Sequence, residues 1–372
     1  MLMSPERSPP PYRVAEAQAQ DDALIRQWLR HRPMQGAVRL SFEREPSAFL
    51  AATVEGGRYH CILVRDRAGQ LLAMGSRCIR PVYVDGAVRD MGYLGQLRSR
   101  PHRNSVGHLA AGFRGLAATR SRDQVPFDLT SIVADNAEAL RLLEQGIDGL
   151  PRYHCESPFT TFLLPTSRRS RAPGGHITPA ARADIDSIAG CLQGYLCHYQ
   201  FAPHWSAAEL LRLLDGGTLA CEDFLVIRRR GGIAACAALW DQRAVKQVVV
   251  QGYSPALTRW RPLLNIALHA TRRPRLPRAP AELKLAYLSH LAVPGNDPRR
   301  FAALVRAARH RGAQRGLDYL AMGLAPAHPL YPVLRGFPHF AFESRLYTVH
   351  WDRGEPRRAA CERIPFVEVA LL

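Results

Sequence analysis

The sequence predicts a mixed α/β protein built from two related domains that follow one another along the chain. Three observations support this prediction: strand-like apolar runs alternate with helical periodicity, one sequence pattern occurs twice, and a stretch rich in proline and arginine separates the two occurrences. We expect each domain to be a twisted, mixed and mostly antiparallel sheet flanked by helices.

The first domain is expected to begin with a strand at residues 12–17 and two helices. The segment 21–32 carries acids at its start and bases at its end, which suits the helix dipole. Its apolar residues share one face at helical spacing, so we assign them to the core. A second helix at 47–56 ends at a glycine, as helices commonly do.

The remaining elements follow from the same patterns. Residues 59–86 predict a hairpin with its turn at 67–69. The further elements expected in the first domain are a strand at 92–99, a helix at 106–118, a strand at 129–134, a helix at 136–145 and late strands at 152–165. Those expected in the second domain are strands at 224–229, 233–240 and 285–293 and a helix at 301–316.

A repeated pattern indicates that the two domains are related. Residues 149–161 read GLPRYHCESPFTT and residues 336–348 read GFPHFAFESRLYT, with Gly, Pro, Glu, Ser and Thr at the same offsets. Upstream, Tyr93 begins YLGQLRSRP and Tyr287 begins YLSHLAVP. The two pairs are 187 and 194 residues apart, nearly one period, which predicts two tandem domains rather than a solenoid.

The boundaries follow from composition. Residues 165–175, PTSRRSRAPGG, lose apolar periodicity and read as a linker. We therefore expect a disordered lead at 1–11, a first domain at 12–166, a linker at 167–175, a second domain at 176–352 and a tail at 353–372. The tail ends in IPFVEVALL, which is apolar enough to add a strand to one domain.

Composition predicts a cytoplasmic protein with no metal. The chain is 47% hydrophobic, lacks a run of about 18 apolar residues, and begins without the apolar core of a signal peptide. Its eight cysteines form no C-x-x-C pair, so we expect buried free thiols. Cys191, Cys197 and His198 lack the further ligands that a zinc site needs.

The net charge of +18 invites a nucleic-acid partner, but its distribution weakens that interpretation. Only Lys246 and Lys284 among the 50 basic residues are lysines, a bias typical of GC-rich coding. The dense arginine clusters at 168–171 and 272–278 lack interleaved aromatic residues. They predict solvated loops or a site for an anionic ligand such as a phosphorylated cofactor. We expect neither a nucleic-acid nor a membrane partner.

The stretch 93–111, YLGQLRSRPHRNSVGHLAA, passes from a strand to a helix through a polar, basic corner. Such a turn directs backbone N–H groups and the positive end of the helix dipole at whatever lies in front, which makes an anion site. A glycine there lets a phosphate approach the backbone closely.

The order of elements, with this corner, resembles the GNAT superfamily of acyl-CoA-dependent N-acyltransferases, in a tandem form with degenerate motifs. The family's corner motif Gln/Arg-x-x-Gly-x-Gly/Ala falls on Asn104, Gly107 and Leu109, of which only the glycine agrees. Asn136 opens DNAEALRLLEQGI, which is similar to the family's N-x-x-A-x-x-L-Y-x-x-x-G-F segment, with Leu143 at the tyrosine position. Asn136 also fits a plain helix N-cap.

The resemblance implies a cofactor, acetyl-CoA or another acyl-CoA, held mainly by the first domain. Backbone donors on the central strand at 97–99 would face the thioester oxygen. The implied cofactor-binding residues are Leu97, Arg98, Ser99, Arg103, Asn104, Ser105, Val106, Gly107, His108, Leu109 and Asn136.

The resemblance also implies direct acyl transfer to an amine that must first lose a proton. His290 stands in the second domain where Gln96 stands in the first and is the candidate base, although a strand histidine is commonly a core residue. Tyr331, in PLYPVLRGF, is the candidate general acid or else packs against the sheet. Further candidate bases are Asp90, Glu156 and Glu343, the last two of which also fit structural roles at strand ends.

Three interpretations of function remain open. The chain is an N-acetyltransferase or other N-acyltransferase, a degenerate tandem protein that binds acyl-CoA or a partner without turnover, or a basic nucleic-acid-associated protein. The acceptor is equally open among small amines, aminoglycosides, protein lysines and peptide N-termini. We expect a monomer with pseudo-dimeric halves or a homodimer.

Overall fold

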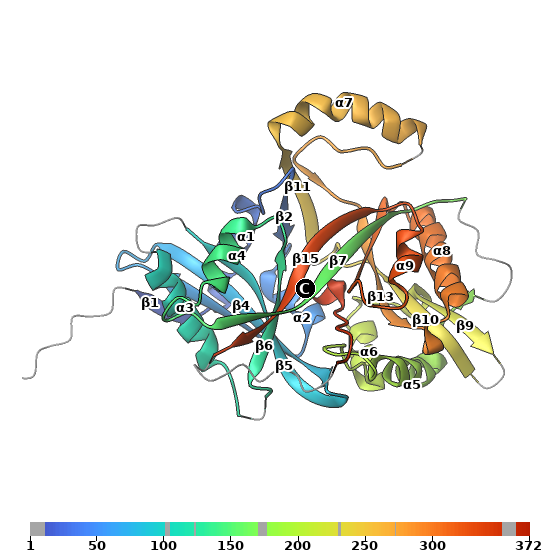
Figure 1. Cartoon of the computed structure of the whole chain (residues 1–372), viewed down its shortest axis with the longest axis horizontal. Helices are drawn as coiled ribbons and strands as arrows, with labels where there is room; N and C mark the ends of the chain where they lie inside the picture. Colours follow the sequence, from blue (N-terminus) through green and yellow to red (C-terminus); the bar gives the residue numbers. More distant parts are fainter. Residues whose placement is uncertain are drawn as a thin grey trace, which may run out of the picture.

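The computed structural model describes residues 12–100, 105–122, 124–169, 177–229, 232–271, 273–351 and 362–372. Within them, strands from both halves of the chain join one twelve-stranded mixed sheet of order β1-β3-β4-β5-β6-β15-β7-β14-β13-β10-β9-β8 (Figure 1). Helices such as α3, α5 and α8 pack against this sheet. This architecture confirms the predicted mixed α/β class. We call residues 12–169 the first half, residues 177–351 the second half and residues 362–372 the tail.

The first half contains most of the elements that its periodicity predicts, and α1 buries the expected apolar face through Ile25, Trp28 and Leu29. Its elements are β1 (Arg13–Glu16), η1 (Ala19–Asp21), α1 (Asp22–His31), β2 (Val38–Glu43), α2 (Ala48–Glu55), β3 (Arg58–Arg65), β4 (Leu71–Val84), β5 (Ala87–Ser99), α3 (Ser105–Ala118), β6 (Phe127–Val133), α4 (Ala137–Glu144) and β7 (Arg152–Pro165).

The second half contains a similar series with additional elements between its central strands. Its elements and that of the tail are β8 (Ile177–Pro179), η2 (Arg182–Asp184), α5 (Ile185–Leu196), α6 (Ala207–Asp215), η3 (Cys221–Asp223), β9 (Phe224–Arg229), β10 (Gly232–Trp240), β11 (Gln247–Tyr253), α7 (Pro255–Ala270), β12 (Ala281–Glu282), β13 (Leu285–Ala292), η4 (Pro294–Asn296), α8 (Pro298–Gln314), β14 (Tyr319–Leu324), α9 (Tyr331–Arg335), β15 (Phe340–His350) and η5 (Val369–Leu371).

The two halves exchange their last strands. β7, from the first half, pairs antiparallel with β14 of the second half, and β15 pairs antiparallel with β6 of the first. β7 and β15 also pair with each other, with Pro158 opposite Arg345. These two residues are 187 residues apart and so hold equivalent places in the repeat. Equivalent residues facing each other on antiparallel strands are what a local twofold axis requires, and the pairing of β7 with β15 has this arrangement.

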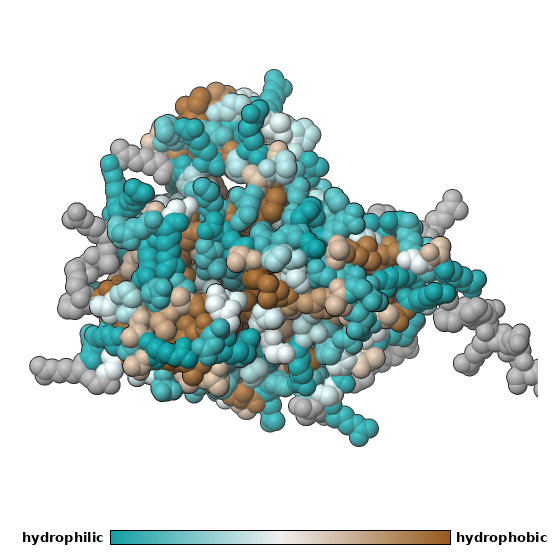
Figure 2. All heavy atoms as spheres, turned by 180° about the vertical axis from the view of Figure 1, so that it is seen from behind, coloured by the Kyte–Doolittle hydropathy of each residue, from teal (hydrophilic) through white to brown (hydrophobic). Residues whose placement is uncertain are grey.

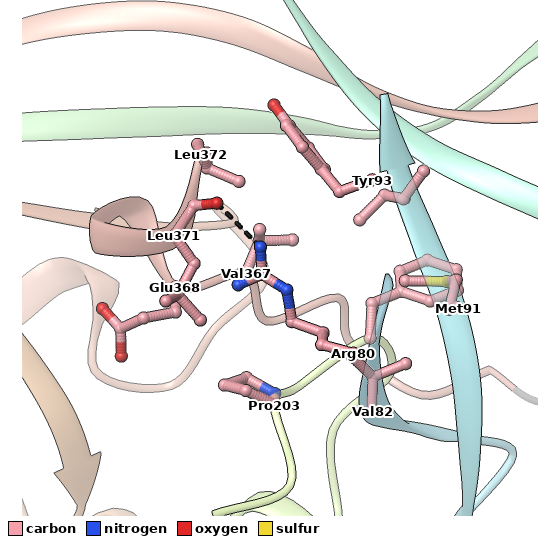
Figure 3. A pocket seen from close by; sticks show the side chains of 11 residues that line it. Arg80, Val82, Met91, Tyr93, Pro203, Val367, Glu368, Leu371 and Leu372 are labelled. Atoms are coloured by element: carbon pink, nitrogen blue, oxygen red, sulfur yellow. Dashed lines mark hydrogen bonds between the residues drawn. The ribbon is translucent and has the colours of Figure 1, made fainter. Parts of the chain in front are cut away.

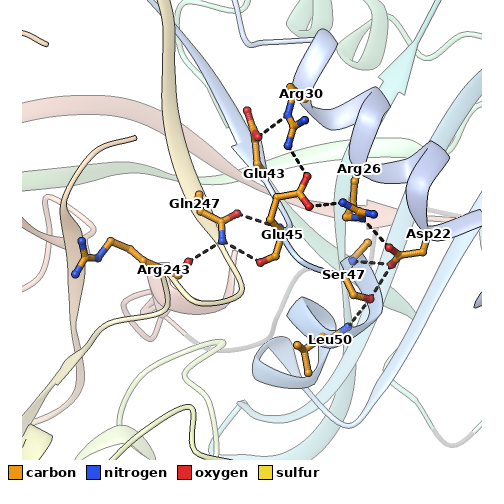
Figure 4. Close-up of polar contacts among 10 residues, drawn as sticks. Asp22, Arg26, Arg30, Glu43, Glu45, Ser47, Leu50, Arg243 and Gln247 are labelled. Atoms are coloured by element: carbon orange, nitrogen blue, oxygen red, sulfur yellow. Dashed lines mark hydrogen bonds and ion pairs between the residues drawn. The ribbon is translucent and has the colours of Figure 1, made fainter. Parts of the chain in front are cut away.

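A second, three-stranded sheet of order β12-β11-β2 also joins the halves, because β2 comes from the first half and β11 from the second. Beside it, the Gln247 side chain bonds both backbone groups of Glu45, accepting from its N–H (3.0 Å) and donating to its carbonyl (2.9 Å) (Figure 4). The Glu45 carboxylate in turn pairs with Arg26 and Arg30 of α1. Helix α1 is thereby tied to the second half.

The tail runs into the middle of the molecule, where Figure 1 shows its end between the two halves. A strand was expected at 364–372, but the chain is irregular there except for the short helix η5 and a single bridge between Gln200 and Pro365. Phe366 N–H donates to the Gln200 carbonyl at 2.8 Å, and Gln200 N–H donates to the Ile364 carbonyl at 3.0 Å. The apolar residues Val367 and Leu371 are buried there.

Candidate functional site

Each half has a pair of parallel central strands that separate after a short stretch of pairing. β5 and β6 are paired only at Tyr93 and Leu129, and β13 and β14 only from Leu285 to Tyr287. Both β5 and β13 contain a bulge with a residue in the left-handed region, Gln96 at φ 53° and His290 at φ 48°. Such a conformation is strained for a residue other than glycine, and bulges re-aim backbone groups near sites of function. These two residues are 194 positions apart, which is also the distance between Tyr93 and Tyr287 in the predicted repeat.

In the first half, the end of β5 and the first turn of α3 lie close together. Ser99 Oγ and His108 Nε2 are 2.7 Å apart, within hydrogen-bond distance. Leu97 and Leu109 line the same apolar cavity of about 10 Å³ beneath α3. The strand end and the helix start that were assigned to the cofactor are therefore neighbours in space.

Some of the other predicted cofactor-binding residues lie within the described part of the chain and some lie outside it. Arg103 and Asn104 lie outside the described residues, as does the whole corner at 101–104. Ser105 begins α3, and Val106 and Gly107 follow in its first turn, half-buried. Asn136 caps α4, since its side chain accepts a hydrogen bond from the backbone N–H of Ala139 at 3.2 Å.

Arginine side chains surround the end of β5 just before that corner. Arg98 Nε donates to the carbonyl of Arg32 (3.2 Å), and Arg32 Nη1 donates to the carbonyl of Ser99 (3.2 Å). Burial lowers the pKa of Arg98 to about 10, and repulsion from Arg44 and Arg32 contributes to the shift. Burial and the charge of Arg100 likewise lower the pKa of Arg32. These mutually repelling cations create a positive potential that favours an anion nearby.

In the second half, His290 sits inside an aromatic cage. Its ring lies 4.2 Å from the ring of Trp205 and 5.1 Å from that of Trp240, centroid to centroid. His290 is fully buried, its Nδ1 lies 2.9 Å from Ser289 Oγ, and burial lowers its pKa to about 3. A group with that pKa is neutral at neutral pH and binds a proton weakly, so these surroundings favour a core role over proton transfer.

Tyr331 belongs to a different network, at the junction of α9 with the exchanged strands. Its hydroxyl shares a hydrogen bond with Thr160 Oγ1 (3.0 Å), which donates to Glu343 Oε2 (2.9 Å). The repeat-related Glu156 accepts from Thr348 Oγ1 at 2.6 Å in the same way. Each repeated glutamate thus holds a threonine of the other copy, which supports the structural role foreseen for both.

The tail fills the opening of the second half. Glu368 Oε2 accepts the backbone N–H of His290 at the bulge (3.0 Å). Val369 lies against β14 so closely that a Cβ added to Gly323 would be 2.4 Å from its side chain. The N-terminus of α8 is also occupied, because the Asp297 carboxylate accepts the backbone N–H groups of Arg299 (2.9 Å) and Arg300 (3.2 Å). A second carboxylate or phosphate would meet a negative charge there.

A small cavity of about 20 Å³ lies where the two halves and the tail meet (Figure 3). Tyr93 and Met91 of β5 face it from the first half, and Pro203 from the second. Arg80 Nη2 crosses it to donate to the carbonyl of Leu371 at 2.9 Å. The Tyr93 hydroxyl is hydrogen-bonded to Ser131 Oγ of β6 (2.7 Å), so the cavity adjoins the point where β5 and β6 part.

Buried charges hold the tail in this place. Glu55 bonds to Arg44 (2.6 Å) and Lys246 (3.1 Å). Burial alone would raise the pKa of Glu55, but these two cations hold it below its usual value. Burial lowers the pKa of Lys246 to about 8. Lys246 Nζ also donates to the backbone oxygens of Ala370 (3.0 Å) and Leu372 (3.1 Å). Glu55 balances only one of the two cations, and these oxygens of the tail solvate the charge of Lys246.

Glu368 and Arg80 are site residues that the sequence did not indicate. Glu368 is buried, and desolvation raises its pKa to about 7 despite the backbone hydrogen bonds from His290 and Ala370. Its only signal in the sequence is an acidic residue within the apolar run IPFVEVALL. Arg80 carries no signal, because its partner Leu371 is nearly three hundred residues away.

Comparisons with known proteins identify the fold. No family model matches the sequence, and no curated protein matches it. N-myristoyltransferase from Saccharomyces cerevisiae, solved with myristoyl-CoA, superposes with a TM-score of 0.60 at 11% identity over 93% of this chain and 81% of that one. The GCN5-related glucosamine N-acetyltransferase region of a fungal multi-domain β-N-acetylglucosaminidase gives a TM-score of 0.56 at 12% identity over 92% of this chain and 38% of that chain.

A GCN5-related N-acetyltransferase from Sphaerobacter thermophilus gives a TM-score of 0.50 at 13% identity over 77% of this chain and 79% of that chain. Identities this low establish the fold alone. The splayed parallel strands, the bulge on the central strand and the similarity to these structures agree with the resemblance seen in the order of elements. The chain therefore has the fold of the GNAT superfamily.

Proposed function

We propose that the protein is an N-acyltransferase that moves an acyl group, an acetyl group in the first instance, from acyl-CoA to an amine. The cofactor would lie in the opening between β5 and β6, with its diphosphate before the first turn of α3. The amine acceptor would approach from the cavity between the halves, where Tyr93 marks the end of the β5–β6 pairing.

The observation that carries this proposal is the contrast between the starts of α3 and α8. The α8 start is capped by the Asp297 carboxylate, and the tail occupies the opening beside it. The α3 start instead follows a strand end surrounded by Arg32, Arg98 and Arg100, with Gly107 in its first turn. A diphosphate fits this place because the arginines and the helix N-terminus attract negative charge, and because Gly107 has no side chain to obstruct its approach.

The acetyl group is favoured by the size of the cavities near the site. The apolar cavity beneath α3 holds about 10 Å³ and the cavity between the halves about 20 Å³. The second is room for about one water molecule, and a long alkyl chain would require both walls to move. An acetyl group would require a smaller movement of these walls than a long alkyl chain.

Bound acyl-CoA would supply a thioester carbonyl, at which a C–N bond forms and the C–S bond breaks as the thiolate leaves. An amine attacks only after losing a proton, and a base with a pKa near 7 suits that step at neutral pH. We assign this base to Glu368, whose pKa is about 7. Glu368 lines the cavity between the halves, but its carboxylate points away from Arg80 in Figure 3, so we propose that a water carries the proton to it. Tyr331 remains the predicted acid, and His290 is less well placed than Glu368.

The test is a binding titration of acetyl-CoA, free CoA and myristoyl-CoA, followed by an assay of thiol release over a panel of amines. Gly107→Asp should weaken the binding of every CoA species about 100-fold, which corresponds to about 3 kcal/mol, because a carboxylate would face the diphosphate. The variant should keep its melting temperature, since an acidic residue in the first turn of a helix is favourable.

Arg299→Asp is the matched control, because it places an acidic residue in the exposed first turn of α8. Its binding of CoA should equal that of the unmodified chain. Equal binding by both variants would contradict the first-half site. Binding without thiol release from any amine would favour the degenerate tandem protein, an alternative that the buried Leu143 supports because the family's usual acid is missing there.

A further inference from the structure

Helix α7 stands away from the rest of the molecule, at the top of Figure 1. None of its residues is buried, although Pro255–Ala270 includes several large apolar side chains. Trp260 is 56% exposed, Leu263 58%, Leu264 40% and Ile266 67%. Trp260, Leu263 and Leu264 follow the i, i+3, i+4 spacing and so lie on one face. Figure 2 shows apolar surface over this part of the molecule from behind.

The opposite face of α7 is held in place by the chain that returns from it. Asn265 donates to the Leu276 carbonyl (3.0 Å) and accepts from its N–H (2.7 Å). Arg261 Nη1 and the Tyr253 hydroxyl both donate to the Pro277 carbonyl, at 3.1 and 2.8 Å. These hydrogen bonds to residues 276 and 277 fix the orientation of the helix, and its apolar face points away from the rest of the molecule.

The charged side chains near the apolar face of α7 are all positive. Residues 255–280 contain six arginines and no aspartate or glutamate. Arg259 is exposed on the helix itself, and Arg275 and Arg278 are exposed on the returning chain. An apolar helical face with an aromatic residue, flanked by arginines, is the composition of helices that lie in the interface of an anionic lipid bilayer.

We propose that α7 docks the protein on an anionic lipid surface, with Trp260, Leu263, Leu264 and Ile266 in the headgroup region and the arginines on lipid phosphates. A second copy of this chain fits less well, because pairing two such faces would bring the exposed Arg259, Arg275 and Arg278 of each copy together without a counter-charge. Nucleic acid fits less well, because aliphatic side chains such as Leu263 and Ile266 offer no stacking surface for bases.

This inference departs from the expectation that the protein has no membrane partner. That expectation rested on the lack of a long apolar run, and among the described residues no helix combines the length and apolarity needed to cross a bilayer. A helix that lies on a surface needs only one apolar face, which the structure makes visible by leaving it uncovered. The docking is independent of the acyl transfer proposed above.

The test uses the full chain with vesicles of phosphatidylcholine alone and of phosphatidylcholine mixed with phosphatidylglycerol. The protein should float with the mixed vesicles at low salt and be released as salt rises. Trp260 is the most exposed of the five tryptophans, so its fluorescence should shift to the blue on binding. Leu263→Glu/Ile266→Glu should reduce binding at least tenfold, and Arg275→Glu/Arg278→Glu should weaken the preference for the anionic lipid.

The matched control is Leu50→Glu/Val88→Glu, which places the same charges at two exposed apolar residues elsewhere, 44% and 45% exposed. It should bind vesicles like the unmodified chain. Equal loss in the control would show only a net-charge effect and overturn the docking face. So would vesicle binding that survives Leu263→Glu/Ile266→Glu, failure to bind anionic vesicles, or a dimer that this variant alone converts to monomer.

Discussion

The two halves of the chain share a backbone plan but differ in what fills it. Each has a bulged central strand that parts from its parallel neighbour, and each gives its last strand to the other. In the first half, β4 passes to β5 through a tight turn at Asp85 and Gly86, both with positive φ. In the second half the corresponding strands β10 and β13 are separated by residues 241–284, which contain β11, α7 and β12.

The buried residues at the centres of the two halves also differ. The first half buries the ion pair of Arg77 and Asp128, with both side chains at 0% exposure. At the centre of the second half, His290 packs among Trp205, Trp240 and Phe224. A repeated backbone therefore does not imply a repeated function, because the groups that fill each opening decide what can enter it.

Breaking the polar centre of the first half should have the largest effect. Arg77 Nε and Nη2 both bond to Asp128, and Arg77 Nη2 also donates to Gln124 Oε1 at 2.6 Å. Arg77→Met should lower the free energy of unfolding by about 3–5 kcal/mol, because it leaves a buried carboxylate without its counter-charge. Urea unfolding measures this change.

The double variant Arg77→Met/Asp128→Leu should recover part of the loss, since replacing both members of a buried ion pair leaves no isolated charge. Recovery should be incomplete, because Trp351 Nε1 donates to Asp128 at 2.8 Å and would lose that acceptor. A double variant no more stable than Arg77→Met would contradict the ion-pair account.

The carboxyl group in the second opening should make stability depend on pH. The pKa of Glu368 is about 7 in the folded chain, against about 4.3 for an unperturbed glutamate. The folded state therefore holds its proton more tightly, and stability falls as pH rises from about 4.3 to about 7. Glu368→Gln should remove this slope and be more stable than the unmodified chain, by on the order of 2 kcal/mol, above about pH 7.

Melting temperatures measured from about pH 5 to about pH 8 check this expectation, with Glu222→Gln as the control because Glu222 is exposed. An unchanged slope in Glu368→Gln would show that another group titrates. If Glu368 is also the base, the same variant should lose thiol release at every pH, although the fold becomes more stable. Loss of activity without the gain in stability would argue against a buried, protonated carboxyl.

Much of the fold could be predicted because it depends on local pattern. The helical spacing in α1 and the apolar runs of β3 and β4 decide which faces are buried. The division into two related domains, which rests on the repeat of GLPRYHCESPFTT, stays a prediction. Less of the candidate site could be predicted from the sequence. Arg80 meets Leu371, and Lys246 meets Ala370, across more than one hundred residues, and no periodicity records such contacts.

The exchange of β7 and β15 was hidden for the same reason, because pairing with the other half leaves each strand's own sequence unchanged. The outward face of α7 could not be predicted either. Apolar residues at helical spacing normally indicate a buried face, and only the structure shows that nothing in the described chain covers this one. The corner at 101–104, which led to the cofactor assignment, lies outside the described residues and stays a prediction.

The helix caps provide the smallest effect and the sharpest comparison between the halves. Asp297→Ala removes the acceptor for two N–H groups of α8 and should cost about 1 kcal/mol, and Asn136→Ala should cost a similar amount at α4.

The backbone N–H groups of Arg300 and Arg299, with the charges of those arginines, lower the pKa of Asp297. Its contribution is therefore present above the unfolded value of about 3.9 and is lost as pH falls through the lower folded pKa. The amide of Asn136 does not titrate, so only the α8 cap should weaken in acid, as melting temperatures near pH 3 and pH 7 would show.

Acetyl-CoA titration then separates the two sites. Asp297→Ala should leave the dissociation constant unchanged, because the cofactor is assigned to the first half. Tighter binding in Asp297→Ala would mean that the freed α8 start takes the diphosphate, and the assignment of the two openings would have to be reversed.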